Sequence, residues 1–292
     1  MKRLDWTSVG GIAGSSAVAA GTAWAIGHGS VHVLALPVAA WAMAAAFAMQ
    51  WIAFVPAFVL RSERFYDLTG SVTYVTVAAL ALAAGRQIDA RSLVVLVLIV
   101  VWAGRLGTFL ALRVRAAGKD ARFDSIKRSF VRFLLAWTLQ GLWVSLTLSA
   151  ALAAMTATAR QPWGAWGWIG LCVWATGFGI EAVADEQKRR FRADPAHRGT
   201  FIDRGLWRWS RHPNYFGEIV LWVGVALVAV PVLTGWQWVG LISPLFVILL
   251  LTRISGIPLV EARADEKWGG QEDYEAYKRA TSVLVPLPRR RS

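Results

Sequence analysis

The sequence predicts an all-α, polytopic integral membrane protein, built as a helical bundle of seven or eight transmembrane helices. Hydrophobic residues make up 56% of its 292 positions, and 17 residues are tryptophan. Mean hydropathy is +0.47, which is too apolar for a soluble domain, and apolar runs long enough to cross a bilayer recur along the chain. We expect a single membrane domain over residues 1–292.

Five apolar runs lie in the first part of the chain. The first is rich in glycine, alanine and serine, which let helices approach closely in lipid; a seven-span bundle would leave this run out. A polar loop at residues 61–70 separates the long second run from a short third one. The expected spans cover residues 8–27, 31–60, 71–84, 92–112 and 133–157.

Three more runs follow. The sixth and seventh are separated by a long basic stretch, residues 185–214, whereas only a few residues separate the seventh from the eighth. The tail from Arg253 onward is polar. The expected spans cover residues 163–184, 215–233 and 236–252.

The net charge of +13 does not indicate a nucleic-acid partner, because the basic residues lie between the apolar runs and no soluble basic domain is present. With eight crossings and a cytoplasmic N-terminus, nearly all Lys and Arg fall on one side, as the positive-inside rule requires. These segments are residues 61–70, 113–132, 186–213 and 253–292. The opposite connections carry only Arg86, Arg91 and Arg160.

A single cysteine, Cys172, lies in an apolar run. One cysteine cannot form an intrachain disulfide, and no Cys/His cluster has zinc-ligand spacing. We therefore interpret Cys172 as a small core residue and expect no metal site.

Charged residues at the end of the sixth span recur at helical spacing. Glu181, Asp185, Arg189 and Arg192 would share one helical face. Arginines there can bind phosphates, and carboxylates can accept from a ribose hydroxyl or an amide. The alternative is an ordinary positively charged flank with intrahelical ion pairs.

The segment S-R-H-P-N-Y before the seventh span is harder to explain by packing. Pro213 suits the first turn of a helix, which places Arg211 and His212 just before a helix N-terminus, where anions bind well. Asn214 and Glu218 lie one turn apart on the same face. A carboxylate inside a span requires a donor, so this set indicates a binding site.

The two clusters, with the R-H-P-N-Y-x-G-E block and the tail E-A-R-A-D-E-K-W-G, resemble the C-terminal signature of the membrane steroid 5-alpha-reductase family, in particular its bacterial branch. The sterol delta-14 and delta-7 reductases are similar, and isoprenylcysteine and phospholipid methyltransferases share R-H-P-x-Y. The resemblance covers roughly residues 90–290.

The resemblance implies NADPH-dependent reduction of the carbon–carbon double bond of a lipophilic enone, such as a 3-oxo-4-ene steroid, with the cofactor bound by the C-terminal half, about residues 160–292. The D-E-Q-K-R-R-F-R run favours a phosphorylated dinucleotide over adenosylmethionine, which has no phosphates. The expected cofactor-binding residues are Glu181, Asp185, Arg189, Arg192, Arg211, His212, Asn214, Tyr215, Glu218 and Arg253.

The reductases of this family also activate the substrate carbonyl with a Gln-Glu pair and a later tyrosine. In this chain Tyr66-Asp67 stands where Gln-Glu would be, and Trp102 occupies the place of the tyrosine. We expect Tyr66 and Asp67 to be catalytic, with Tyr74 as an alternative proton donor. Equally, Asp67 could serve only as a helix cap.

Two other functions stay open. The chain could be an adenosylmethionine-dependent membrane methyltransferase of a lipid or prenylcysteine, or a non-catalytic membrane scaffold of the same fold, which the tryptophan at position 102 would favour. The expected partners are a lipophilic small molecule and membrane lipid. The expected location is a bacterial inner membrane, with the cofactor site facing the cytoplasm.

Overall fold

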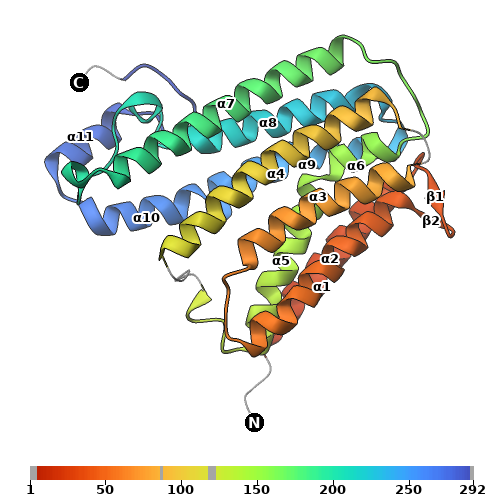
Figure 1. Cartoon of the computed structure of the whole chain (residues 1–292), viewed down its shortest axis with the longest axis horizontal. Coiled ribbons are helices and arrows are strands. Elements are labelled where there is room, and N and C mark those ends of the chain that lie inside the picture. Colours follow the sequence, from red (N-terminus) through yellow and green to blue (C-terminus); the bar gives the residue numbers. More distant parts are fainter. Residues whose placement is uncertain (1–4, 86–87, 118–122, 290–292) are drawn as a thin grey trace. The chain divides into compact units, whose positions relative to one another are not determined.

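The computed structural model describes residues 5–85, 88–117 and 123–289, and these are mainly helical (Figure 1). The described residues contain eight helices long and apolar enough to cross a membrane, from Trp6–Gly27 to Gly235–Trp268. The prediction of an all-α polytopic membrane bundle is confirmed. Only the first of these helices was in question, and it is 22 residues long.

Two compact units divide the chain. Unit 1 comprises Met1–Gly167 and Val228–Ser243, and unit 2 comprises Trp168–Leu227 and Pro244–Ser292. That residues 1–292 form a single membrane domain stays a prediction. All of the expected cofactor-binding residues belong to unit 2, whereas Tyr66, Asp67 and Tyr74 belong to unit 1.

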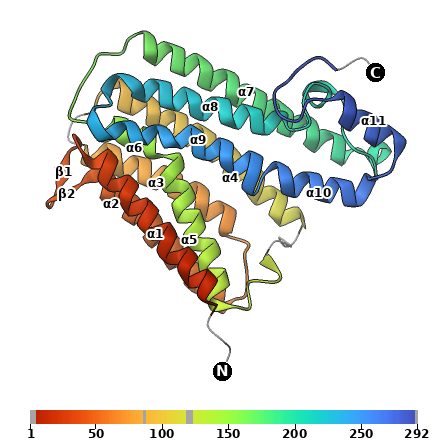
Figure 2. The ribbon, with the colours of Figure 1, turned by 180° about the vertical axis from the view of Figure 1, so that it is seen from behind.

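In unit 1, α5 packs against both α1 and α2, and α3 packs against both α2 and α4 (Figure 1 and Figure 2). Aromatic residues fill the contact of α2 with α5, where Phe54 meets Phe133 and Trp137 is completely buried. The elements of this unit are α1 (Trp6–Gly27), β1 (His32–Val33), β2 (Leu36–Pro37), α2 (Val38–Val59), α3 (Tyr66–Ala84), α4 (Ala90–Ala117), α5 (Phe130–Thr147) and α6 (Ser149–Thr156).

Two predicted boundaries of unit 1 are wrong. Residues 31–37 do not begin the second span, because His32–Pro37 form the β1–β2 hairpin, whose turn residues Leu34 and Ala35 have positive φ. Pro37, still extended, is the N-cap of α2, which begins at Val38. The third span begins at Tyr66 rather than near residue 71. Tyr66 and Asp67 therefore belong to the first turn of α3, not to a loop before it.

Arg91, an exception to the charge pattern, has a structural explanation. Its guanidinium is buried, with 2% of the residue exposed, and donates to the carbonyls of Val228 at 2.5 Å and Pro162 at 3.2 Å. Arg160 pairs with Asp89 at 2.9 Å. Both arginines thus bind within unit 1, while Arg86 lies outside the described residues.

In unit 2, α7 continues past the membrane-spanning length, so that the run from Asp185 is helical, and the polar tail forms two helices. A π-helical turn, Leu250–Ile254, connects α9 to this tail. The helices of this unit are α7 (Ala165–Ala193), α8 (Pro213–Ala229), α9 (Ile242–Leu249), α10 (Ile257–Trp268) and α11 (Glu272–Ala280).

Glycines bring α7 and α8 into close contact along their length (Figure 1 and Figure 2). A side chain at Gly217 would overlap the backbone of Glu181 and Gly177, and one at Gly224 would overlap the backbone of Trp174. Small residues of this kind allow helices to approach closely in lipid. The contact places the polar end of α7 directly against the start of α8.

The interpretation of Cys172 as a core residue is wrong, because the residue is exposed on α7. A membrane helix presents an apolar outer face to lipid, so an apolar run does not distinguish a core position from a lipid-facing one.

Candidate functional site

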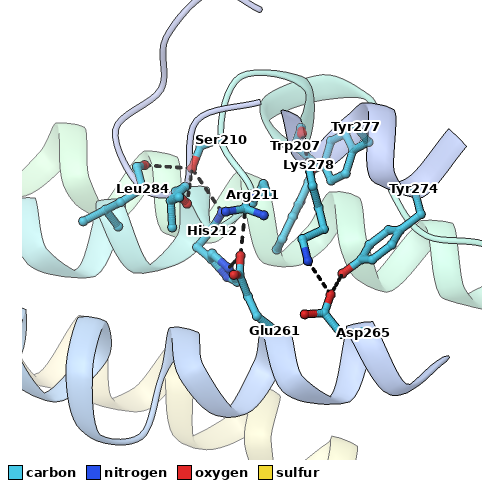
Figure 3. Close-up of polar contacts among 11 residues, drawn as sticks. Trp207, Ser210, Arg211, His212, Glu261, Asp265, Tyr274, Tyr277, Lys278 and Leu284 are labelled. Carbon is cyan, nitrogen blue, oxygen red and sulfur yellow. Dashed lines mark hydrogen bonds and ion pairs between the residues drawn. The ribbon is translucent and has the colours of Figure 1, made fainter. Parts of the chain in front are cut away.

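The Arg-His-Pro segment before α8 is held by the end of the chain. The hydroxyl of Ser210 accepts from the His212 N–H at 3.1 Å and donates to the Leu284 carbonyl at 2.7 Å (Figure 3). The N–H of Arg211 donates to the carbonyl of Ser282 at 2.8 Å. The backbone of this segment therefore depends on residues more than 70 positions further along the chain.

One carboxylate, that of Glu261 on α10, faces both basic side chains of the segment. Its Oε1 lies 3.3 Å from Arg211 Nε and 3.0 Å from His212 Nε2 (Figure 3). His212 is 4% exposed. Burial lowers the pKa of His212 below its usual value, the Glu261 carboxylate opposes this shift only in part, and Lys188 and Arg211 add to it. The imidazole is therefore neutral at neutral pH.

A second polar contact joins α7 to α8. Asn214 Nδ2 donates to Asp185 Oδ1 at 3.2 Å. Asp185 is 8% exposed, and Glu181, one turn earlier on α7, is 2% exposed. The carbonyl Oδ1 of Asn214 is buried and has no hydrogen-bond partner among the described residues. Asn214 therefore offers a buried acceptor to an N–H or O–H of a ligand.

The structure thus brings together the predicted residues at the facing ends of α7 and α8. Tyr215 joins them, because its ring stacks on His212 with 5.6 Å between centroids. Glu218 lies one turn beyond Asn214 and is partly exposed rather than fully buried. This group comprises Glu181, Asp185, Arg211, His212, Asn214, Tyr215 and Glu218.

Three predicted arginines do not join this group. Arg189 is exposed and binds both oxygens of Glu186, at 2.7 and 2.8 Å, as the ion-pair interpretation of this run expected. Arg192 is exposed at the end of α7, and Arg253 is exposed in the π-helical turn. Such turns are frequent at functional sites, and both side chains have the length to reach a ligand.

The sequence-based prediction missed the acidic residues of α10. Asp265, one turn after Glu261, accepts from Lys278 Nζ at 2.6 Å and from the Tyr274 hydroxyl at 2.9 Å (Figure 3). The Tyr277 hydroxyl donates to the Trp207 carbonyl at 2.8 Å. The spacing of Glu261 and Asp265 in the E-A-R-A-D run was the available signal, since residues four apart share a helical face.

The expected catalytic tyrosine of unit 1 has a structural contact. The Tyr66 hydroxyl donates to the Ala136 carbonyl of α5 at 2.9 Å. Its ring lies edge-on to Trp137, with 5.2 Å between centroids, and packs against Phe123. These contacts direct Tyr66 toward α5.

Asp67 and Tyr74 follow a different stripe of α3. The ring of Tyr74 lies edge-on to Trp102 of α4, with 5.0 Å between centroids, and both residues are buried. Ser71 lies against Gly107 of α4 and donates to the Asp67 carbonyl. Positions four and seven residues apart share a helical face, so Asp67 and Tyr74 both belong to the stripe that faces α4.

No three His, Cys, Asp or Glu side chains within the described ranges are grouped so that they could hold a metal ion.

The family model described as Protein of unknown function (DUF1295) matches residues 53–281, which is most of the chain. The chain belongs to the DUF1295 family. The match includes both α3 and the α7–α8 site.

Individual relatives connect this DUF1295 member to steroid reductases. It is 30% identical to 3-oxo-5-alpha-steroid 4-dehydrogenase 1 of Rattus norvegicus over 119 residues, 40% of each chain. It is 31% identical to Steroid 5-alpha-reductase DET2 of Arabidopsis thaliana over 130 residues, 42% of this chain and 44% of that protein. An uncharacterised protein of Schizosaccharomyces pombe is 32% identical over 128 residues, 36% of this chain and 37% of that protein.

These matches confirm the resemblance to the steroid 5-alpha-reductase family that the motifs indicate. The chain matches less than half of the length of each of these relatives. No solved structure matches it significantly.

Proposed function

We propose that this DUF1295 member is an integral membrane oxidoreductase that uses NADPH to reduce the carbon–carbon double bond of a lipophilic enone, such as a 3-oxo-4-ene steroid. The names of two relatives support this reaction class. The observation that carries the proposal is the buried acceptor of Asn214, held by Asp185 beside the Arg211–His212 pair.

The residues present in unit 2 fit NADPH. The buried Oδ1 of Asn214 can accept from the amide of a nicotinamide, while its Nδ2 is already held by Asp185. Arg211 lies just before the N-terminus of α8, where the free N–H groups and the helix dipole favour phosphate. Arg192 and Arg253 would extend the phosphate contacts. When bound, the cofactor would supply the hydride.

For the carbonyl of the substrate, the geometry of unit 1 favours Tyr74 over Tyr66 as proton donor, with Asp67 two turns earlier on the same stripe of α3. The Tyr66 hydroxyl already donates its proton in a hydrogen bond to the Ala136 carbonyl. Tyr74 shares the α4-facing stripe with Asp67 and lies against Trp102. A hydroxyl on this stripe could protonate the carbonyl side of an enone while Asp67 orients it.

The cofactor is tested first. Purified protein in mild detergent is titrated with NADPH, NADH and adenosylmethionine while its melting temperature is followed. A ligand at a hundred times its Kd stabilises by about 2.7 kcal/mol. We expect stabilisation by NADPH alone. Stabilisation by adenosylmethionine would instead identify a methyltransferase, and no response to any of the three would favour a scaffold.

The reaction is tested next, by following NADPH oxidation with steroidal, isoprenoid and fatty enones, each paired with its saturated ketone. Oxidation with an enone and none with its ketone supports the proposal. NADPH binding without turnover of any enone would contradict the reductase assignment.

The basic connecting segments also lead us to propose a bacterial inner membrane location with the cofactor site on the cytoplasmic side.

A further inference from the structure

We propose that Glu261 is a positioning residue that holds Arg211 and His212 in the orientation in which they meet a phosphorylated cofactor, an inference that rests on the proposed function. No sequence motif assigned a role to Glu261. It reaches the site from α10, 49 residues beyond His212.

A single oxygen of Glu261 faces two side chains: it forms an ion pair with Arg211 and a hydrogen bond with His212. Its Oε1 is 3.3 Å from Arg211 Nε and 3.0 Å from His212 Nε2, and Figure 3 shows both side chains directed at the carboxylate. The Arg211 side chain is only 13% exposed, so water replaces the carboxylate poorly. Without Glu261, the guanidinium would lose the group that fixes its direction.

The same contact fixes the protonation pattern of His212. A carboxylate only accepts, so the Nε2 that faces it must carry the proton, and Nδ1 is left as an acceptor in the neutral ring. The stacked Tyr215 ring, inclined by 8°, holds the imidazole plane. Glu261 thus determines which nitrogen of His212 can accept from a ligand.

Neighbouring contacts hold α10 itself in place. Asp265, on the same face of α10, accepts hydrogen bonds from Lys278 and Tyr274 of α11 rather than from Arg211. The carboxylate of Glu261 is therefore held at a set position, which is what a positioning role requires.

Two variants separate positioning from simple charge balance. Glu261→Ala removes both contacts, whereas Glu261→Gln removes the charge but keeps an oxygen that accepts from His212 Nε2. Glu266→Gln, an exposed glutamate of the same helix, is the matched control for charge. NADPH affinity is measured by fluorescence titration at low and at physiological salt.

If Glu261 positions the site, Glu261→Ala weakens NADPH binding about tenfold, Glu261→Gln stays within about twofold of the wild type, and Glu266→Gln changes nothing. If Glu261 only balances charge, both Glu261 variants bind NADPH more tightly at low salt, because a negative charge near the phosphates is gone. That result, or unchanged affinity in Glu261→Ala, would overturn the proposal.

A cofactor-free measurement separates this inference from the proposed function. Nitrogen-15 NMR of labelled histidine reports the tautomer and titration of His212, whose charged neighbours are Glu261 of α10, Lys188 of α7 and Arg211. We expect the Nε2–H tautomer in the wild type and a lower His212 pKa in Glu261→Gln. The Nδ1–H tautomer in the wild type would overturn the inference whatever cofactor the protein binds, and even if Glu261→Ala does not fold.

Discussion

Among single residues, Asn214 has the most specific environment: one end of its amide binds Asp185 and the other is buried without a partner among the described residues. We predict that Asn214→Ala weakens NADPH binding about tenfold, because it removes the acceptor for the cofactor amide. Titration of NADPH in detergent measures the effect.

The matched control is Gln187→Ala on α7. The Gln187 Oε1 accepts from the Leu206 N–H at 2.9 Å, so this variant removes an amide that serves the protein rather than the ligand. It should lower the melting temperature and leave NADPH affinity intact. Equal NADPH affinity in folded Asn214→Ala and wild-type protein would remove Asn214 from the site.

We predict opposite effects on enone turnover for substitutions of the two tyrosines of α3. Tyr74→Phe should lower turnover of an enone by about 10²–10⁴, the usual contribution of a general acid, and retain NADPH binding. Tyr66→Phe should retain turnover and lower stability by about 1 kcal/mol, because the Ala136 carbonyl loses its hydrogen bond. Loss of turnover in Tyr66→Phe alone would restore the original assignment to Tyr66.

His212 makes stability depend on pH. Its pKa is lowered in the folded protein, chiefly by burial, so the unfolded chain takes up the proton more readily. The stability that neutral His212 contributes is therefore complete above the ordinary pKa of about 6.5 and is lost as pH falls through the folded pKa. Melting temperatures of the wild type should fall more steeply on acidification than those of His212→Gln.

His28→Gln, which replaces an exposed histidine of unit 1, is the control for the substitution itself. An identical slope for the wild type and His212→Gln would show that His212 does not titrate differently in the folded and unfolded chains.

At the scale of elements, the contact of α7 with α8 depends on glycine. A Cβ at Gly217 would overlap the backbone of Glu181, which cannot move aside as a flexible side chain could. We predict that Gly217→Ala destabilises the protein by about 1–3 kcal/mol and weakens NADPH binding. Thermal unfolding in detergent and NADPH titration measure both effects.

Gly179→Ala is the comparison, because a Cβ at this position of α7 meets no described atom within 4 Å. Alanine favours helix over glycine by about 0.5–1 kcal/mol, so this variant should be neutral or more stable. Destabilisation of both variants alike would mean that the α7–α8 contact is not the cause.

At the scale of the whole molecule, the charge pattern predicts which connections share a side of the membrane. In a Cys172→Ala background, an impermeant maleimide added to intact cells should label Thr158→Cys and not Arg198→Cys. Both positions are exposed. Labelling of Arg198→Cys in intact cells would contradict the proposed cytoplasmic orientation of the cofactor site.

The sequence by itself determined the fold class, a count of seven or eight spans and the start of α8 at Pro213, and the structure has eight candidate spans among its described residues. Hydropathy, span length and the fixed φ of proline are local properties, so they can be read along the chain. It also indicated the α7 face, because Glu181 and Asp185 lie one helical turn apart.

Only the tertiary structure decided which side chains those residues meet. The Tyr66 hydroxyl donates to the Ala136 carbonyl. Glu261 contacts Arg211 and His212 from α10, a segment that the sequence indicated only as part of a polar tail. Contacts between residues so far apart depend on how close two helices can approach. That distance is set by the volumes of side chains along the whole interface, such as the glycines of α7 and α8, and not by any local pattern.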